Sequence, residues 1–180
     1  QAEFPAQFQL VAAMNPCRCG MAGEPGMSCA RGPRCQSDYQ ARISGPMMDR
    51  IDLRIEVPAL SPGDLIRPNK PESSSVVALR VAQARQIQKE RFEKRGLFGI
   101  STNSQCTTAL VEEVAAPDAA GLALLSDASE KLRFSARAYH RILKVARTLA
   151  DLDGVEQVGR IHLAEAISYR MSGERMAKAA

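Results

Sequence analysis

Two stretches near the N-terminus have the hydrophobic patterns of β-strands. Residues 8–14 form a nearly unbroken apolar run, which is typical of a strand buried on both faces of a parallel sheet. Residues 53–57 alternate apolar and charged side chains, so one face of this second strand should meet water. Two strands are too few to form the sheet that the first one requires. We therefore predict that the other strands of this sheet lie upstream of residue 1.

The pattern changes to helical periodicity from Ser75 onward. Apolar residues three and four positions apart mark the buried face of a helix, as with Val77, Val81, Ala84 and Ile87. Ser135 has the position of a helix N-cap. The expected helices run over 75–95, weakly over 108–115, from near Pro117 to Leu132, from Ser135 to near Gly154, and over 161–171.

The segments between these patterns are rich in glycine, proline, serine and cysteine. Residues 15–35 should form a loop or small knuckle, and the proline-rich stretch after Val57 reads as a linker. The predicted fold class is an α/β fragment, holding the C-terminal strands of a parallel sheet, followed by an all-α domain. The corresponding domains are residues 1–58 with the knuckle at 15–35, a linker at 59–74, and the helical domain at 75–180.

Composition and charge are those of an ordinary water-soluble protein, with 45% hydrophobic residues and a net charge of +4. The mild positive charge permits contact with nucleic acid without requiring it. No apolar run approaches the roughly 20 residues that span a bilayer. Residues 1–9 also lack the pattern of a signal peptide. We therefore expect a cytoplasmic protein with no membrane partner.

Four of the five cysteines, Cys17, Cys19, Cys29 and Cys35, lie close together in the chain. Their count favours a structural zinc site, because four thiolates complete the tetrahedral shell of Zn²⁺. The spacing C-x-C-x9-C-x5-C is not the usual pair of C-x-x-C knuckles, so free thiols stay an alternative. A catalytic zinc is not expected, since no histidine lies near the cluster. Cys106 is isolated and is interpreted as an ordinary thiol.

Three polar residues need separate interpretation, and each has a plain one on sequence alone. Asn15 follows the apolar run, at the strand edge where α/β sheets bind ligands, but Asn-Pro also initiates turns. Arg50 could simply pair with a neighbouring aspartate on the surface. Arg137, in the first turn after Ser135, could be a solvated arginine on a basic helix.

Three strings in this sequence resemble the magnesium-chelatase-like AAA+ ATPases. They are FQLVAAMNPC at 8–17, RISGPMMDRIDL at 42–53 and SARAYHRILKVART at 135–148. The strings are similar to those of the ComM (YifB) branch in particular. This resemblance implies the C-terminal part of an AAA+ core followed by a helical lid, in a hexameric, DNA-bound translocase that promotes branch migration during natural transformation.

The resemblance also implies roles for the three polar residues in ATP hydrolysis. Asn15 resembles sensor 1 and Arg137 resembles sensor 2, both acting on the nucleotide of their own subunit. Arg50 resembles the arginine finger delivered to a neighbouring subunit, with Arg42 as a second choice. ATP and Mg²⁺ are the implied cofactors. The Walker A loop and the acidic Walker B strand do not occur in these 180 residues, so this chain alone is expected not to hydrolyse ATP.

Two alternatives remain open on the sequence. One is a non-enzymatic zinc-knuckle module that binds nucleic acid through basic helices, such as the arginine- and lysine-rich helix at 75–95. The other is the ATPase subunit of a magnesium chelatase, which would share the same ATPase residues. His140 and His162 have no acidic or thiol partner at ligand spacing, so we interpret them as surface or packing residues.

Overall fold

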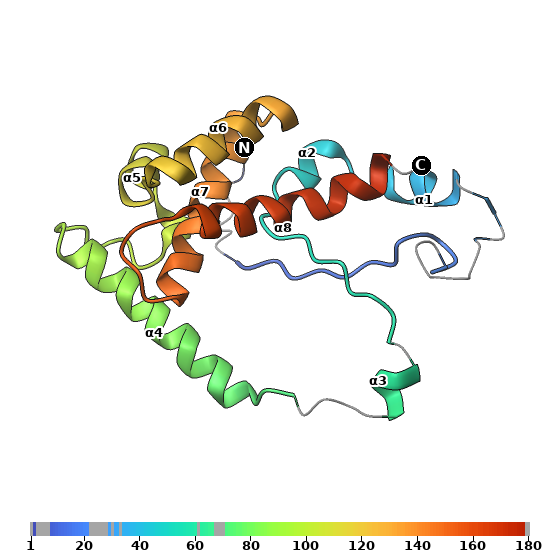
Figure 1. The fold of residues 1–180 in the computed structure, drawn as a ribbon, viewed down its shortest axis with the longest axis horizontal. Coiled ribbons are helices and arrows are strands. Elements are labelled where there is room, and N and C mark those ends of the chain that lie inside the picture. The colour runs from blue at the N-terminus through green and yellow to red at the C-terminus, as the bar shows by residue number, and fades with distance from the viewer. Residues whose placement is uncertain are drawn as a thin grey trace. The chain divides into compact units, whose positions relative to one another are not determined.

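The computed structural model describes residues 2, 8–21, 29, 31–32, 34–60, 62–66 and 71–178. It separates into two compact units, Gln1–Ser44 and Gly45–Ala179. The regular structure of the described residues is helical (Figure 1). No described helix is both long enough and apolar enough to cross a membrane.

The first unit contains one described helix, α1 (Arg34–Gln40), and a chain that turns sharply around its cysteines. The amide of Gly20 donates to the carbonyl of Cys17 (3.1 Å), and the amide of Gly32 donates to that of Cys29 (2.9 Å). Both glycines have left-handed backbone conformations, with φ of 78° and 73°. A residue with a Cβ would be strained there, so the two glycines allow the chain to reverse directly after a cysteine.

The two predicted strands are not confirmed in the described residues. Residues 8–14 have no regular secondary structure and are exposed, with Val11 85% accessible. Residues 53–57 are also irregular, and their described main-chain contact is the amide of Arg54, which donates to the carbonyl of Tyr169 (3.0 Å). The physical reason is that a strand requires a neighbour for its backbone hydrogen bonds. Apolar patterning alone does not supply that neighbour.

The second unit is helical, and the helical character predicted from Ser75 onward is confirmed in its described residues. Its described elements are α2 (Gly45–Met48), α3 (Pro62–Ile66), α4 (Ser74–Glu93), η1 (Asn103–Gln105), α5 (Thr108–Val114), α6 (Ala119–Leu132), α7 (Ala136–Leu152) and α8 (Arg160–Lys178). The predicted cap at Ser135 is present, because its Oγ accepts a hydrogen bond from the amide of Ala138 (3.1 Å). Asp118 caps α6 in the same way, accepting from the amide of Gly121 (2.6 Å).

Helix α7 is the centre of this unit and packs against α4, α5 and α8 (Figure 1). Its apolar stripe follows the predicted spacing, with Ile142, Ala146 and Ala150 all buried. On α4 the predicted stripe is only partly correct. Ala84 is buried, but Val77 and Val81 are exposed, and the buried positions continue instead towards the C-terminal end of the helix at Phe92.

A buried polar network joins α4, η1 and α7 beside the apolar core. The Asp151 carboxylate is 1% exposed and accepts hydrogen bonds from Arg147 Nε (3.0 Å), Asn103 Nδ2 (2.8 Å) and Arg91 Nη1 (3.1 Å). Burial lowers the pKa of the Arg147 guanidinium, and the carboxylate of Asp151 opposes that effect. Two arginines on one carboxylate satisfy charges that would be costly to bury alone.

Candidate functional site

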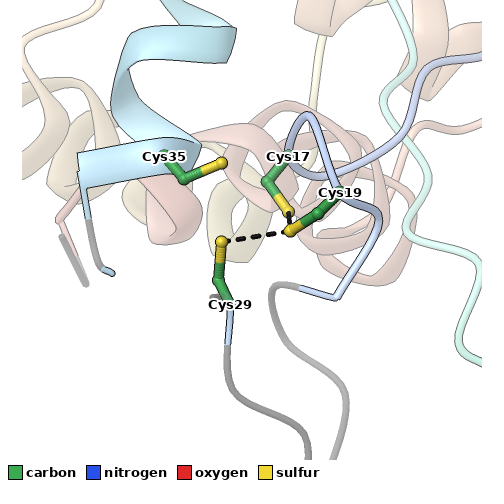
Figure 2. A group of neighbouring side chains, drawn as sticks. All are labelled: Cys17, Cys19, Cys29 and Cys35. Carbon is green, nitrogen blue, oxygen red and sulfur yellow. Dashed lines mark hydrogen bonds between the residues drawn. The ribbon is translucent and has the colours of Figure 1, made fainter. Parts of the chain in front are cut away.

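The four clustered cysteines of the first unit converge on one point. Their Sγ atoms all lie within 4.8 Å of one another, and Figure 2 shows the four side chains directed towards a common centre. The Sγ of Cys19 lies 3.2 Å from that of Cys17 and 3.0 Å from that of Cys29. Around a tetrahedral zinc ion, sulfur atoms lie about 3.8 Å apart, given zinc–sulfur bonds of about 2.3 Å. A small expansion of the cluster would therefore accommodate the ion.

The crowding of the sulfur atoms affects how readily they ionise. The hydrogen bond that Cys29 shares with Cys19 raises the pKa of the Cys29 thiol to about 12, because crowded sulfurs resist becoming negatively charged. A divalent cation removes that resistance, since it stabilises thiolates directly. In the described residues the group consists of cysteines alone. Four such ligands would close the coordination shell, as in structural zinc sites.

Asn15 lies two residues before this cluster and is exposed. Together with Ala13, Met14 and Tyr39 of α1 it lines an open depression. The same helix contacts the link between Asn15 and the cysteines, because Gln40 Nε2 donates to the carbonyl of Pro16 (3.3 Å). Helix α1 thus carries one cysteine of the cluster at its start and borders Asn15 at its end.

Arg50 is exposed and lies just after α2, in the second unit. Its Nη1 donates to the carbonyl of Pro46 (2.7 Å). The adjacent carboxylates are bound by other arginines, Asp49 by Arg170 and Asp52 by Arg141. In the described part of the chain Arg50 therefore does not form the surface pair with a neighbouring aspartate that was its plainer interpretation.

Arg137 lies in the first turn of α7, exposed and without a carboxylate partner among the described residues. The start of this helix is close to the segment that carries Arg50. Ser135 Oγ donates to Asp49 Oδ2 (3.4 Å), and Arg141 Nη1 donates to the carbonyl of Arg50 (2.7 Å). The structure therefore brings the Arg50 segment and the first two turns of α7 together. Asn15 and Arg42 belong to the other unit.

The basic residues of α4 are mostly neutralised by carboxylates. On α4, Arg80 binds Glu72 with two hydrogen bonds (2.9 and 3.0 Å), and Lys89 lies 3.7 Å from Glu93. Arg95, just after the helix, lies 3.3 Å from Glu113. Arg91 is turned inward to the buried Asp151. A helix whose cations are already paired has less charge to offer to nucleic-acid phosphates.

Both histidines contact acidic side chains, which their interpretation from sequence did not foresee, since His162 Nε2 lies 3.1 Å from Asp153 Oδ2. His140 Nε2 lies 2.8 Å from Glu112, and His162 is buried, with Nδ1 accepting from the amide of Gly159 (2.9 Å). Sequence reasoning missed the roles of Arg141 and Arg170, since their partners are 89 and 121 residues away. The one nearby clue to these roles in the sequence was that aspartates lie on either side of Arg50.

Comparison with known proteins identifies the class of this chain. Residues 71–170 match the family model for the C-terminal domain of magnesium chelatase subunit ChlI, and residues 1–65 match the model for magnesium chelatase subunit ChlI. The chain therefore belongs to the magnesium chelatase ChlI family, which confirms the resemblance inferred from its motifs.

Within this family the chain is similar to the ComM and YifB proteins of bacteria. It is 43% identical over 169 residues to the competence protein ComM of Haemophilus influenzae, covering 93% of this chain and 31% of that protein. It is 38% identical over 168 residues to YifB of Escherichia coli, with the same coverage, and 36% identical over 172 residues to an uncharacterised protein of Mycobacterium tuberculosis, covering 96% of this chain and 33% of that protein. The chain spans about a third of the length of these relatives.

Proposed function

We propose that this chain is the sensor and lid portion of a ComM-like AAA+ ATPase that uses ATP and Mg²⁺ to move DNA during natural transformation. The observation that carries the proposal is the pair of exposed arginines, Arg50 and Arg137, which the second unit holds without carboxylate partners among its described residues. A permanent, planar charge left unpaired on a folded scaffold is suited to a phosphate group. Family membership and the competence relative support this reading.

In this proposal Asn15 acts as sensor 1, Arg50 as the arginine finger and Arg137 as sensor 2. Phosphoryl transfer spreads negative charge over the γ-phosphate oxygens, and a guanidinium placed against them stabilises the transition state. An amide at the position of Asn15 would orient the attacking water. Asn15 and Arg137 would act on the nucleotide of their own subunit, whereas Arg50 would act on the nucleotide of a neighbouring subunit. The proposed working form is therefore a ring in the cytoplasm, and six is the expected number of subunits.

The proposed domains are the end of the ATPase core at 1–58, a linker at 59–74 and the lid at 75–180. The boundary between the two family models falls at 65–71, inside the proposed linker, and supports this division. The compact second unit begins earlier, at Gly45. The Arg50 segment is therefore described together with the lid helices.

We also propose that the cysteine cluster binds one structural zinc ion. Support comes from the four cysteine sulfur atoms, which are gathered within 4.8 Å of one another. Cys17, Cys19, Cys29 and Cys35 would be the ligands. The ion would organise a glycine- and proline-rich loop that has few apolar residues to pack.

The nucleic-acid module without enzymatic activity is less well supported. The cations of α4 that it would use are largely paired with glutamates or turned into the core. The chelatase alternative keeps its support from the family name, and it uses the same ATPase residues. Stimulation of turnover by DNA, compared with stimulation by a porphyrin and Mg²⁺, separates the motor from the chelatase.

The proposal is tested in the full-length protein by Arg50→Ala and Arg137→Ala. Loss of the finger should lower kcat for ATP hydrolysis by about 10³-fold, with ATP binding changed by less than about threefold. Arg85→Ala is the matched control, because Arg85 is an exposed arginine on α4. An Arg50→Ala enzyme that retains turnover within about twofold of the wild type would exclude the finger role.

A further inference from the structure

Both carboxylates next to Arg50 are bound by arginines from the helical bundle. Asp49 Oδ1 accepts a hydrogen bond from Arg170 Nη2 on α8, and Asp52 Oδ1 accepts one from Arg141 Nη1 on α7. These two ion pairs lie on either side of Arg50 in the chain. We refer to them together as the Asp–Arg clasp.

Main-chain contacts reinforce the clasp at the same place. The guanidinium of Arg141 that binds Asp52 also donates to the carbonyl of Arg50 itself (2.7 Å). The backbone amide of Arg54 donates to the carbonyl of Tyr169 (3.0 Å). The side chain of Arg54 donates from Nη2 to the carbonyl of Met48 (2.7 Å). The backbone at Arg50 and at Arg54 is therefore hydrogen-bonded to α7 and α8.

The two pairs of the clasp differ in burial. The side chains of Arg170 and Asp49 are 7% and 31% exposed, whereas those of Arg141 and Asp52 are 29% and 53% exposed. Removing one partner of a buried pair leaves an uncompensated charge and destabilises the fold strongly. The outer pair can be altered at lower cost, so it is the suitable place to test what the clasp does.

The clasp also controls the charge around Arg50. An aspartate at position 49 or 52 lies close enough in the chain to attract the guanidinium of Arg50. Each carboxylate is instead occupied by another arginine, and Arg50 bonds only to the carbonyl of Pro46 among the described partners of its side chain. If Arg141 were removed, the carboxylate of Asp52 would lose its partner and become available to Arg50.

We propose that Asp49, Asp52, Arg141 and Arg170 are positioning residues, because the two arginines hold the neighbouring aspartates away from the guanidinium of Arg50 and so keep its charge available for phosphate. This inference rests on the proposed function of Arg50. It adds that the charge available at the finger depends on arginines of α7 and α8. It also adds that the two aspartates act through their arginine partners and do not touch the nucleotide.

The test uses three variants of the full-length protein: Arg141→Gln, Asp52→Asn and the double variant. Arg141→Gln should lower kcat for ATP hydrolysis by about tenfold with little change in KM, since the released aspartate captures Arg50. The double variant removes that aspartate as well, and kcat should return to within about threefold of the wild type. A purely structural role predicts the opposite order, with the double variant at least as impaired as Arg141→Gln.

Two further measurements make each outcome decisive. Glu72→Gln is the matched control, because it breaks the exposed pair with Arg80 elsewhere in the unit and should leave kcat unchanged. Hydrogen exchange at the Arg54 amide should speed up in Arg141→Gln while α5 keeps its protection. If Arg141→Gln does not fold, Arg141→Met, which also removes the charge, is measured alone and with Asp52→Asn, and the same recovery is expected.

The inference is overturned if Arg141→Gln turns over ATP at the wild-type rate, or if the double variant shows no recovery. Arg50→Ala is measured alongside. If that variant retains turnover, the proposed function itself fails, and the clasp proposal fails with it. If Arg50→Ala loses turnover while Arg141→Gln keeps it, only the clasp proposal is wrong.

Discussion

The buried carboxylate of Asp151 shows how single residues of this chain depend on distant partners. Arg91 and Arg147 both belong to segments whose basic residues suggest solvent-exposed helix faces. Instead, both guanidiniums bind Asp151 inside the second unit. Local sequence offers the Arg147–Asp151 pair at helical spacing, but it could not reveal the contact of Arg91, because Arg91 and Asp151 are 60 residues apart and charged residues are usually exposed. Whether an arginine can be buried depends on whether a carboxylate partner lies there to balance its charge.

Replacing Asp151 with asparagine should destabilise the chain by about 3–5 kcal/mol, since two buried arginines would lose their counter-charge. Asp127→Asn is the control, as that aspartate is exposed on α6 and should change stability by less than about 0.5 kcal/mol. Urea unfolding followed by circular dichroism gives both values. An Asp151→Asn chain as stable as Asp127→Asn would mean that the network contributes little.

At the scale of elements, the helices were predictable and the strands were not. A helix satisfies its own backbone, so the spacing of apolar residues and caps such as Ser135 are sufficient to locate it. A strand depends on a neighbour that periodicity does not identify, which is why 8–14 and 53–57 failed as predictions. The same limitation applies to α4, whose apolar stripe was correct only where another helix covers it, around Ala84.

Replacing single side chains by alanine should therefore have different effects at the two ends of helix α4. Phe92 is fully buried in the core, and Phe92→Ala should cost about 3–5 kcal/mol of stability. Val77 lies exposed on the first part of the same helix, and Val77→Ala should change stability by less than about 0.5 kcal/mol. Thermal unfolding of the two variants checks the contrast. Equal losses would show that the N-terminal half of α4 is packed after all.

At the scale of the whole molecule, the two units are stabilised by different kinds of interaction. The second unit has a cluster of buried aliphatic side chains from α4 to α8. Among the described residues of the first unit, the buried side chains are Cys17 and Cys35. Composition indicated this difference, because the cysteines concentrate in one segment and the apolar periodicity in the other. The convergence of the four sulfurs could not be read from their irregular spacing.

The chain purified under reducing conditions should contain about one equivalent of zinc. Cys17→Ser should lose most of it, and Cys106→Ser, which alters a buried thiol of the other unit, should keep it. Removal of the metal with a chelator should increase hydrogen exchange around α1 and leave α7 protected. A zinc content below about half an equivalent, unaffected by Cys17→Ser, would argue for free thiols.

The hydroxyl of Ser135 has a consequence that reaches beyond its role as a cap. It accepts from the amide of Ala138 and donates to Asp49 at the same time. One oxygen atom thus links the turn that presents Arg137 to the segment that presents Arg50. A change at this serine would therefore remove a cap next to Arg137 and a hydrogen bond next to Arg50 at the same time.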